Sequence, residues 1–219
     1  MSNTAEPSPD YKTILRKLAP TLLLKEREIY LRLGPRAGPA YARLRILDVL
    51  GLASSDPAVP KTSRSFVFVC FGNIMRSPMA EALLKRELSH LSPRQPLRIA
   101  SAGLHATPGN TAHPWALVAS AEFEISLENH RARLLTAEMV QQADAIFAMD
   151  FQNKAELLTL FPDSRHKIFM LSAYLNGPGQ HGEIPDPYLG NLETTRNCYQ
   201  MLESCVRNLA AELFPPCSR

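Results

Sequence analysis

The sequence contains no uninterrupted apolar run of about eighteen residues, the length that a membrane-spanning helix needs. Its first residues, MSNTAEPSPDYK, do not have the basic and then apolar layout of a secretory signal peptide. The four cysteines form no CxxC pair and no cluster with histidine that would suit zinc. We therefore expect no transmembrane segment and no metal site, and thiols of this kind favour a reducing, cytoplasmic location.

A strong net charge is also missing. The chain carries 24 Lys and Arg residues against 21 Asp and Glu residues, which gives a formal net charge of +3 at pH 7. A nucleic-acid-binding domain would concentrate basic side chains on one face, so we predict no nucleic-acid partner. With 219 residues, 45% of them hydrophobic, the chain can bury one substantial core and still carry an additional segment.

Residues 1–60 are the candidate for that additional segment, because proline interrupts them repeatedly. Two stretches, at 22–33 and 40–52, mix leucine with arginine and lysine and predict short amphipathic helices. We expect an N-terminal extension that is partly helical or disordered, followed by a linker around residues 54–63. Its role stays open between packing on the main domain, docking of a protein partner and weak contact with a membrane surface.

The main domain is expected at residues 65–214, where strand and helix patterns alternate. Short apolar runs predict strands at 66–69, 97–100, 145–149 and 167–171, with a turn at 101–103. Helical patterns occur after residue 78 and at 114–123, 136–142, 151–161 and 192–214. This alternation predicts an α/β fold in which a parallel sheet carries helices on both faces. Binding sites in such sheets lie at the carboxyl ends of the strands.

The most informative segment is CFGNIMRSP, residues 70–78, which joins the first predicted strand to the next helix. Five residues separate Cys70 from Arg76 in this loop. Backbone N–H groups at the start of a helix, together with the helix dipole, stabilise an anion such as a phosphate or a thiolate. Gly72 permits close approach of the backbone, and Asn73 tolerates the left-handed conformation that a concave anion nest often requires.

These residue types suit covalent phosphoryl transfer. A Cys70 thiolate, stabilised by the loop N–H groups and the Ser77 hydroxyl, can attack phosphorus and form a phosphocysteine. Arg76 can bind the phosphate oxygens with both arms of its guanidinium group. Asp186, held between two prolines, is the candidate that protonates the leaving group and later deprotonates water. Apolar side chains would enclose an aromatic phosphoester, namely Phe71, Ile74 and Tyr188.

Over about residues 65–214, the chain resembles the low-molecular-weight protein tyrosine phosphatases. The motifs that carry the resemblance are CFGNIMRSP at 70–78, SAG at 101–103, HRAR at 130–133, MD at 149–150 and DPYLGN at 186–191. The resemblance implies a flavodoxin-like, three-layer fold around a four-stranded parallel sheet. It also implies a phosphatase that needs no cofactor and that acts on phosphotyrosine protein substrates.

By this similarity, Cys70 is the nucleophile, Arg76 binds phosphate, and Asp186 is the general acid and then the general base. The substrate-binding positions would be Phe71, Gly72, Asn73, Ile74, Met75, Ser77 and Tyr188. Ser101 and His130 would join Asn73 in a hydrogen-bond network that supports the loop.

Two positions depart from the pattern of the family. Met75 stands where many relatives carry a second cysteine, so a protective disulfide with the nucleophile cannot form there and Cys70 is open to further oxidation. Leu189 stands where many relatives carry a second aromatic residue, which alters one wall of the pocket.

Three other functions stay open on the sequence alone. Arsenate reduction on a related fold needs further redox cysteines, whereas the next cysteines here, Cys198 and Cys205, fall on the last helix and are expected to pack as small apolar residues. Phosphoarginine phosphatases of the same fold typically have threonine where Ile74 stands. A non-catalytic phosphate-recognition scaffold would be favoured if Cys70 or Asp186 were absent, and both are present.

Overall fold

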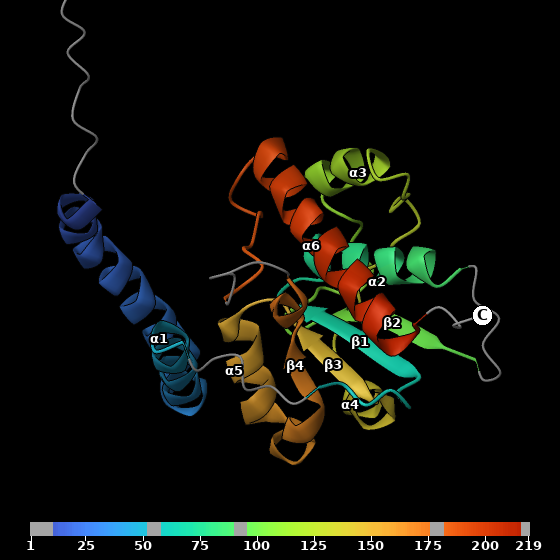
Figure 1. Ribbon diagram of the computed structural model, residues 1–219, viewed down its shortest axis with the longest axis horizontal. Coiled ribbons are helices and arrows are strands. Elements are labelled where there is room, and N and C mark those ends of the chain that lie inside the picture. Colours follow the sequence, from blue (N-terminus) through green and yellow to red (C-terminus); the bar gives the residue numbers. More distant parts are fainter. Residues whose placement is uncertain (1–10, 52–57, 90–95, 176–181, 216–219) are drawn as a thin grey trace, which may run out of the picture.

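The computed structural model describes residues 11–51, 58–89, 96–175 and 182–215 (Figure 1). Its strands are β1 (Ser65–Cys70), β2 (Arg98–Gly103), β3 (Ala145–Ala148) and β4 (Ile168–Met170). Its helices are α1 (Tyr11–Val49), α2 (Arg76–Glu87), α3 (Pro114–Ala121), α4 (Ala137–Gln142), α5 (Phe151–Leu160) and α6 (Leu192–Leu213), with short 3₁₀ helices η1 (Pro162–Lys167) and η2 (Leu171–Tyr174) on either side of β4. The predicted linker at 54–63 lies partly outside the described residues.

The described strands form one four-stranded parallel sheet in the order β2-β1-β3-β4. This arrangement confirms the predicted fold class, and it places β1 between β2 and β3. Every residue of β1 is buried, as its continuous apolar run predicted. The carboxyl ends of β1, β2 and β3 therefore meet at one edge of the sheet, where the loop that begins at Cys70 lies.

β2 is longer than the sequence pattern predicted. The SAG segment at 101–103, expected as a turn, continues the parallel ladder and pairs with residues 68–70 of β1. The prediction of a turn was wrong because small residues give a weak strand signal, whereas pairing with β1 satisfies their backbone groups whatever the side chains are. As a consequence, Gly103 lies directly beside Cys70.

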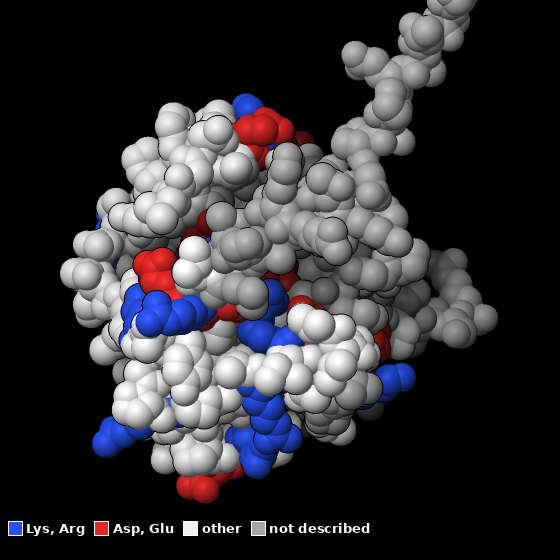
Figure 2. All heavy atoms as spheres, turned by 90° about the vertical axis from the view of Figure 1, so that its left-hand side faces the viewer, with Lys and Arg blue, Asp and Glu red and all other residues white. Residues whose placement is uncertain are grey.

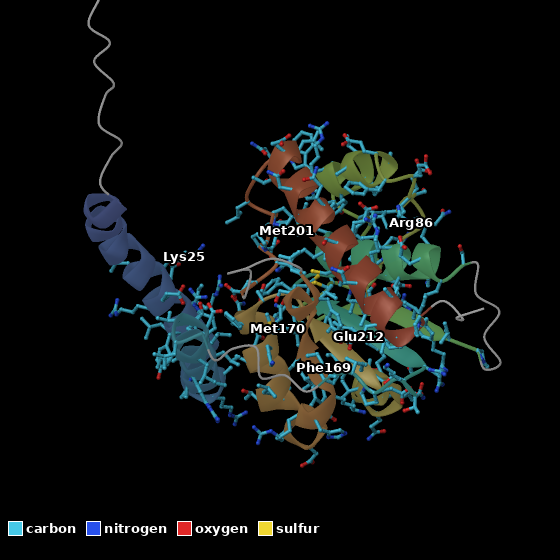
Figure 3. The ribbon with its side chains drawn as sticks, in the orientation of Figure 1. Lys25, Arg86, Phe169, Met170, Met201 and Glu212 are labelled. Carbon is cyan, nitrogen blue, oxygen red and sulfur yellow. The ribbon has the colours of Figure 1, made fainter. Side chains whose placement is uncertain are left out.

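Successive residues of a strand point to opposite faces of the sheet, and each face here has its own apolar core. Phe68 belongs to the core beneath α2, α3 and α6, whereas Val69 belongs to the core shared with α4 and α5. The same alternation occurs in β4, where Phe169 joins the first core and Met170 the second (Figure 3). Helices therefore cover both faces of the sheet, as predicted.

α6 buries the face that its periodicity predicted, formed by Tyr199, Leu202, Val206, Leu209 and Leu213. Cys198 and Cys205 are also buried on this helix as free thiols, which confirms that they pack as small apolar residues. Burial raises the pKa of each of these two thiols to about 12, so neither is a thiolate near neutral pH.

α1 is a helical hairpin rather than one straight helix. The chain bends at Gly34, whose φ of 69° is readily accessible to glycine, and Pro35 begins the second arm. The two arms are tied together at Glu26, which accepts hydrogen bonds from Tyr41 (2.5 Å) and from Arg45 Nε (3.0 Å). Both predicted helices of the extension are therefore present, although their bounds differ from the predicted ones.

The hairpin packs against α5, on the side of that helix away from the sheet (Figure 1). Its apolar side chains join the same core cluster as Phe151 and Ala155 of α5; they are Ile29, Leu33, Ala40, Tyr41 and Leu44. Of the three roles left open for the extension, packing on the main domain is thus observed. On this side of the molecule, basic and acidic side chains lie interspersed with uncharged ones (Figure 2). None of the described helices is long and apolar enough to span a membrane.

The core beneath α6 provides a test of the packing. Leu202 is 0% exposed, so Leu202→Ala should lower the free energy of unfolding by about 2–5 kcal/mol, through lost apolar burial and the cavity that remains. Leu189 is 94% exposed, and the matched substitution Leu189→Ala should change the free energy of unfolding by less than about 0.5 kcal/mol. Denaturant unfolding measures both values, and equal effects would contradict the assignment of this core.

Candidate active site

Cys70 ends β1 and begins the loop that leads into α2, which starts at Arg76. Among the described residues, no side chain caps the first turn of α2. The N–H groups of that turn have no partner within the helix and remain available to an anion. The chain therefore places a thiol and a set of backbone donors at the same edge of the sheet, as the loop sequence predicted.

The Cys70 sulfur is buried and surrounded by hydrogen-bonding groups. Its Sγ lies 3.0 Å from Ser77 Oγ and accepts a hydrogen bond from the Asn73 N–H at 3.3 Å. Ser77 Oγ itself accepts from Asn73 Nδ2 at 2.9 Å, and it lies 3.3 Å from the Ala102 carbonyl oxygen. When Cys70 is a thiolate, the single hydroxyl proton of Ser77 can be donated to the sulfur, so both neighbours favour the anion.

Asn73 fixes the shape of the loop. It adopts the left-handed conformation that the sequence predicted, with φ of 54°. Its side-chain amide also donates to Ser101 Oγ at 2.9 Å, and its Oδ1 accepts from the Arg133 backbone N–H at 2.9 Å. His130 Nε2 lies 2.6 Å from the Asn73 carbonyl oxygen. The three predicted network residues are thus brought together.

The protonation state of His130 follows from its surroundings. Burial lowers its pKa, although the hydrogen bond to the Asn73 carbonyl acts in the opposite direction. A neutral ring must carry its proton on Nε2 to donate to that carbonyl. Sequence reasoning missed one further member of the network, Glu81 of α2, whose Oε2 accepts from the Ser101 hydroxyl at 2.5 Å. A glutamate in a helix is usually a surface residue, so no local signal identified it.

Arg76 is 1% exposed and lies at the centre of a set of carboxylates and carbonyls. Its Nη1 donates to Asp150 Oδ2 at 2.7 Å and to the Ile184 carbonyl at 2.9 Å, and its Nη2 donates to Asp186 Oδ2 at 2.6 Å. Burial alone would lower the pKa of Arg76, but Asp150 and then Asp186 outweigh it and hold that pKa above its ordinary value. Arg76 therefore stays a cation, as phosphate binding requires.

Asp150 was part of a sequence motif but was not predicted as a site residue. It follows β3 and caps α5, because its Oδ1 accepts from the Asn153 N–H at 2.7 Å while Oδ2 binds Arg76. Its position at the carboxyl end of a strand next to β1 was the signal that could have identified it.

Asp186 reaches the site from the segment before α6. Its side chain is 43% exposed, with Oδ2 on Arg76 and Oδ1 accepting from the Tyr188 N–H at 3.2 Å. One oxygen is therefore held against the phosphate-binding group while the carboxyl keeps access to solvent. A group that gives a proton to a bound ester and later takes one from water needs both contacts.

The rim of the loop is aromatic and exposed. The Phe71 and His105 rings lie with centroids 4.6 Å apart and planes tilted by 31°, and Tyr188 meets His113 edge-on with centroids 5.7 Å apart. The sequence identified Phe71 and Tyr188 but missed both histidines, which approach from other loops. Ile74 follows Phe71 in the same loop and is partly buried. Its carbonyl accepts a hydrogen bond from the His113 N–H at 3.0 Å.

Two of the predicted substrate-binding positions behave differently from the rest. The Met75 side chain is buried in the core, and the Tyr199 hydroxyl donates to the Met75 carbonyl, so Met75 can contribute only backbone atoms to the loop. Gly72 has room for a side chain, because an added Cβ would meet nothing closer than Ile74 Cγ1 at 3.6 Å. At Gly103 an added Cβ would lie 2.7 Å from the Phe71 carbonyl oxygen and 2.9 Å from the Asn73 nitrogen. The tightest approach of backbone to backbone is therefore at Gly103.

Across the described parts of the chain, there is no group of three or more His, Cys, Asp or Glu side chains placed to hold a metal ion. The chemistry available at this edge of the sheet is that of a thiol, a guanidinium group, a carboxyl group and a fan of backbone donors.

Comparison with known proteins agrees with this geometry. The sequence model of the low molecular weight phosphotyrosine protein phosphatase family matches residues 65–215. The protein-arginine-phosphatase of Bacillus subtilis is 38% identical over 149 residues, 67% of this chain and 95% of the relative. The low molecular weight protein-tyrosine-phosphatase Wzb of Escherichia coli is 36% identical over 149 residues, 68% of this chain and 95% of the relative. The crystal structure of the tyrosine phosphatase Wzb from Escherichia coli K30 with sulphate is similar with a TM-score of 0.62 at 30% identity, covering 69% of this chain and 99% of that one.

The contrast between the two glycines gives a test of the loop packing. Gly103→Ala forces the Phe71–Asn73 backbone to move, so we expect the free energy of unfolding to fall by about 1–3 kcal/mol, as for other overpacked sites. Gly72→Ala meets only ordinary contacts and should change the free energy of unfolding by less than about 0.5 kcal/mol. Denaturant unfolding of both variants measures the difference. The packing argument would be wrong if Gly72→Ala were the more damaging change.

Proposed function

The chain belongs to the low molecular weight phosphotyrosine protein phosphatase family, and from this premise we propose that Cys70, Arg76 and Asp186 hydrolyse phosphotyrosine-type phosphomonoesters. It is an enzyme, a hydrolase of the protein tyrosine phosphatase class. The observation that supports the assignment of roles is the convergence of a hydrogen-bonded thiol, a buried guanidinium group and a part-exposed carboxyl group at one loop. The similarity to protein phosphatases supports a phosphoprotein as the substrate.

In the first step, the Cys70 thiolate attacks phosphorus while the bond from phosphorus to the substrate oxygen breaks. Asp186, in its protonated form, gives its proton to that leaving oxygen, so a neutral phenol departs. Arg76 and the loop N–H groups hold the three other phosphate oxygens as charge moves between sulfur and the leaving group. The products of this step are the dephosphorylated substrate and a phosphocysteine.

In the second step, a water molecule attacks the phosphocysteine. Asp186, now a carboxylate, takes a proton from the water as its oxygen bonds to phosphorus, and the phosphorus–sulfur bond breaks. Cys70 leaves as a thiolate, which Ser77 Oγ and the Asn73 N–H stabilise again. Phosphate then departs and the enzyme returns to its starting state without any change in redox state.

The apolar rim supports an aromatic substrate. Phe71 and Tyr188 are both exposed, and Ile74 is a partly buried apolar residue of the same loop as Phe71. A phenyl ring would be enclosed by such side chains, whereas a phosphorylated guanidinium group would leave its N–H donors facing an apolar wall. The relationship to a protein-arginine-phosphatase supports phosphoarginine as the second candidate substrate.

The remaining alternatives are less well supported. Cys198 and Cys205, the two other cysteines within the described residues, are buried in α6 and are far from being thiolates near neutral pH, which argues against their use in arsenate reduction. A scaffold without activity would not need an acid at Asp186. The free thiols Cys198 and Cys205 support the predicted cytoplasmic location, since they suit a reducing compartment.

Substitution of the proposed nucleophile and acid tests the mechanism. With phenyl phosphate, Cys70→Ser should abolish turnover, and Asp186→Asn should lower kcat by about 10²–10⁴-fold through the loss of proton donation. Inhibition by inorganic phosphate should persist in Asp186→Asn, because Arg76 and the loop are intact. Cys205→Ser makes the same chemical change at a buried cysteine of α6 and should retain turnover in the folded protein. Wild-type rates in Cys70→Ser would refute the mechanism.

The choice between the two substrates can be tested at Ile74. Replacement by threonine offers a hydroxyl to a guanidinium group and removes apolar contact with a phenyl ring. We expect Ile74→Thr to shift the ratio of kcat/KM for phosphoarginine against phosphotyrosine peptides by at least about tenfold toward phosphoarginine, the effect of one hydrogen bond to a charged group. Val118→Thr, at an exposed position of α3, is the matched control. An unchanged ratio would show that Ile74 does not select the substrate.

A further inference from the structure

The N-terminal hairpin contacts the segment that carries the proposed general acid. Arg45, in the second arm of α1, places its Nη1 3.6 Å from Glu183 Oε2. Glu183 lies three residues before Asp186 and follows the undescribed residues 176–181. The family match begins at residue 65, so this contact joins a part of the chain outside the match to a part inside it.

Glu183 ties the acid segment to the beginning of α5. Its Oε1 accepts a hydrogen bond from the Phe151 N–H at 2.7 Å, in the first turn of that helix. Burial raises the pKa of Glu183, and the nearby charges of Asp150 and Glu26 act in the same direction. The hydrogen bond from Phe151 and the charge of Arg45 oppose this shift and favour the carboxylate. The carboxylate therefore depends on its partners on both sides, and one of them comes from the hairpin.

The next residue carries the connection into the active site. Ile184 is fully buried, its N–H donates to the Met149 carbonyl at 2.8 Å, and its carbonyl accepts from Arg76 Nη1 at 2.9 Å. Pro185 and Pro187 then flank Asp186, and proline fixes φ. The two prolines thus restrict how far Asp186 can move independently of Glu183 and Ile184.

The hairpin presents Arg45 in a fixed position. Arg45 Nε and Nη2 donate to Glu26 of the first arm at 3.0 Å and 3.1 Å, and Nη1 donates to Asp48 at 3.2 Å. Its guanidinium carbon lies 5.5 Å from the centre of the Phe151 ring. Because Tyr41 is buried and the neighbouring apolar residues of the hairpin are partly buried in the core cluster that includes α5, the cation approaches the acid segment as part of a packed unit.

We propose that the hairpin positions the general acid: Arg45 holds Glu183, and Glu183 sets the place of Asp186 over the leaving oxygen. This proposal rests on the proposed function, in which Asp186 protonates that oxygen. Arg45 and Glu183 are positioning residues. Glu183 contacts Phe151 and Arg45, and neither Glu183 nor Arg45 contacts the reacting groups in the bonds described above. Their loss should weaken proton donation and leave phosphate binding and attack by Cys70 intact.

The leaving group distinguishes this role from a general loss of structure. A phenyl leaving group needs the proton far more than a 4-nitrophenyl group, which departs readily as an anion. We expect Arg45→Met in the full chain to lower kcat/KM for phenyl phosphate by about five- to twentyfold, which is part of the effect of losing the general acid altogether. For 4-nitrophenyl phosphate, the loss of kcat/KM should be less than about twofold. The inhibition constant of inorganic phosphate should be unchanged. Arg45→Lys, which keeps the charge, should restore most of the lost activity.

Control variants complete the experiment. Arg43 is exposed in the same arm of the hairpin. Arg43→Met makes the same chemical change and should leave kcat/KM unchanged with either ester. Glu183→Gln keeps an acceptor for the Phe151 N–H but removes the charge that Arg45 binds, so it should reproduce the Arg45→Met effect, and the double variant should be no worse than either one. Glu183→Gln also serves if Arg45→Met fails to fold.

Two outcomes would overturn the proposal, and they differ. The first is an equal loss of kcat/KM with the two esters, or additive effects of Arg45→Met and Glu183→Gln. If Asp186→Asn still depends strongly on the leaving group, as a missing acid should, this outcome refutes the positioning role alone. If Asp186→Asn itself shows no such dependence, the proposed acid is wrong, and the role of the hairpin falls with it.

Discussion

The charge of Arg76 has almost no contact with water, so the protein itself must balance it. Asp150 and Asp186 do so, together with the carbonyl of Ile184. Arg76 begins α2, Asp150 follows β3, and Ile184 and Asp186 precede α6, so one side chain joins three segments that are far apart in the sequence. The same guanidinium group is the proposed phosphate ligand. Its orientation is therefore fixed by the fold before any substrate arrives, which is the condition for effective electrostatic stabilisation.

The thiol side of the site depends on a similar pre-arrangement. Asn73 adopts a left-handed conformation, and its side chain is held by Ser77, Ser101 and the Arg133 backbone. With the loop in this shape, the Asn73 N–H donates to the Cys70 sulfur, and the absence of a side chain at Gly103 allows β2 to lie against the loop. The left-handed backbone and the tight packing cost free energy, and the hydrogen bonds offset it. A loop held in this way can bind a sulfur anion and a phosphate in turn without rearranging.

The N-terminal hairpin extends this arrangement beyond the matched domain. α5 contacts the hairpin on one side and the sheet on the other, and Phe151 at its start touches both Glu183 and Arg45. The hairpin thus packs beside the helix that Asp150 caps and beside the segment that carries Asp186. The proposed positioning role of Arg45 depends on this placement.

The order of strands and helices and the parallel sheet could be predicted from the sequence, because hydrophobic periodicity is a local property. The sequence also identified Cys70, Arg76 and Asp186 as the residues to which catalytic roles are proposed, because the first two share one short loop and the third lies between two prolines. The strand character of residues 101–103 could not be predicted, since it comes from pairing with β1. Glu81, His113 and Glu183 were also missed as site residues, because each has an ordinary local pattern and acquires its role only from a neighbour distant in the chain. Asp150 was missed although it follows a strand next to β1, since its contact with Arg76 forms only on folding. The sequence by itself determined which groups can carry the chemistry. The tertiary structure decided which carboxylates balance the buried arginine and where the extension lies, since both depend on contacts between segments that only folding brings together.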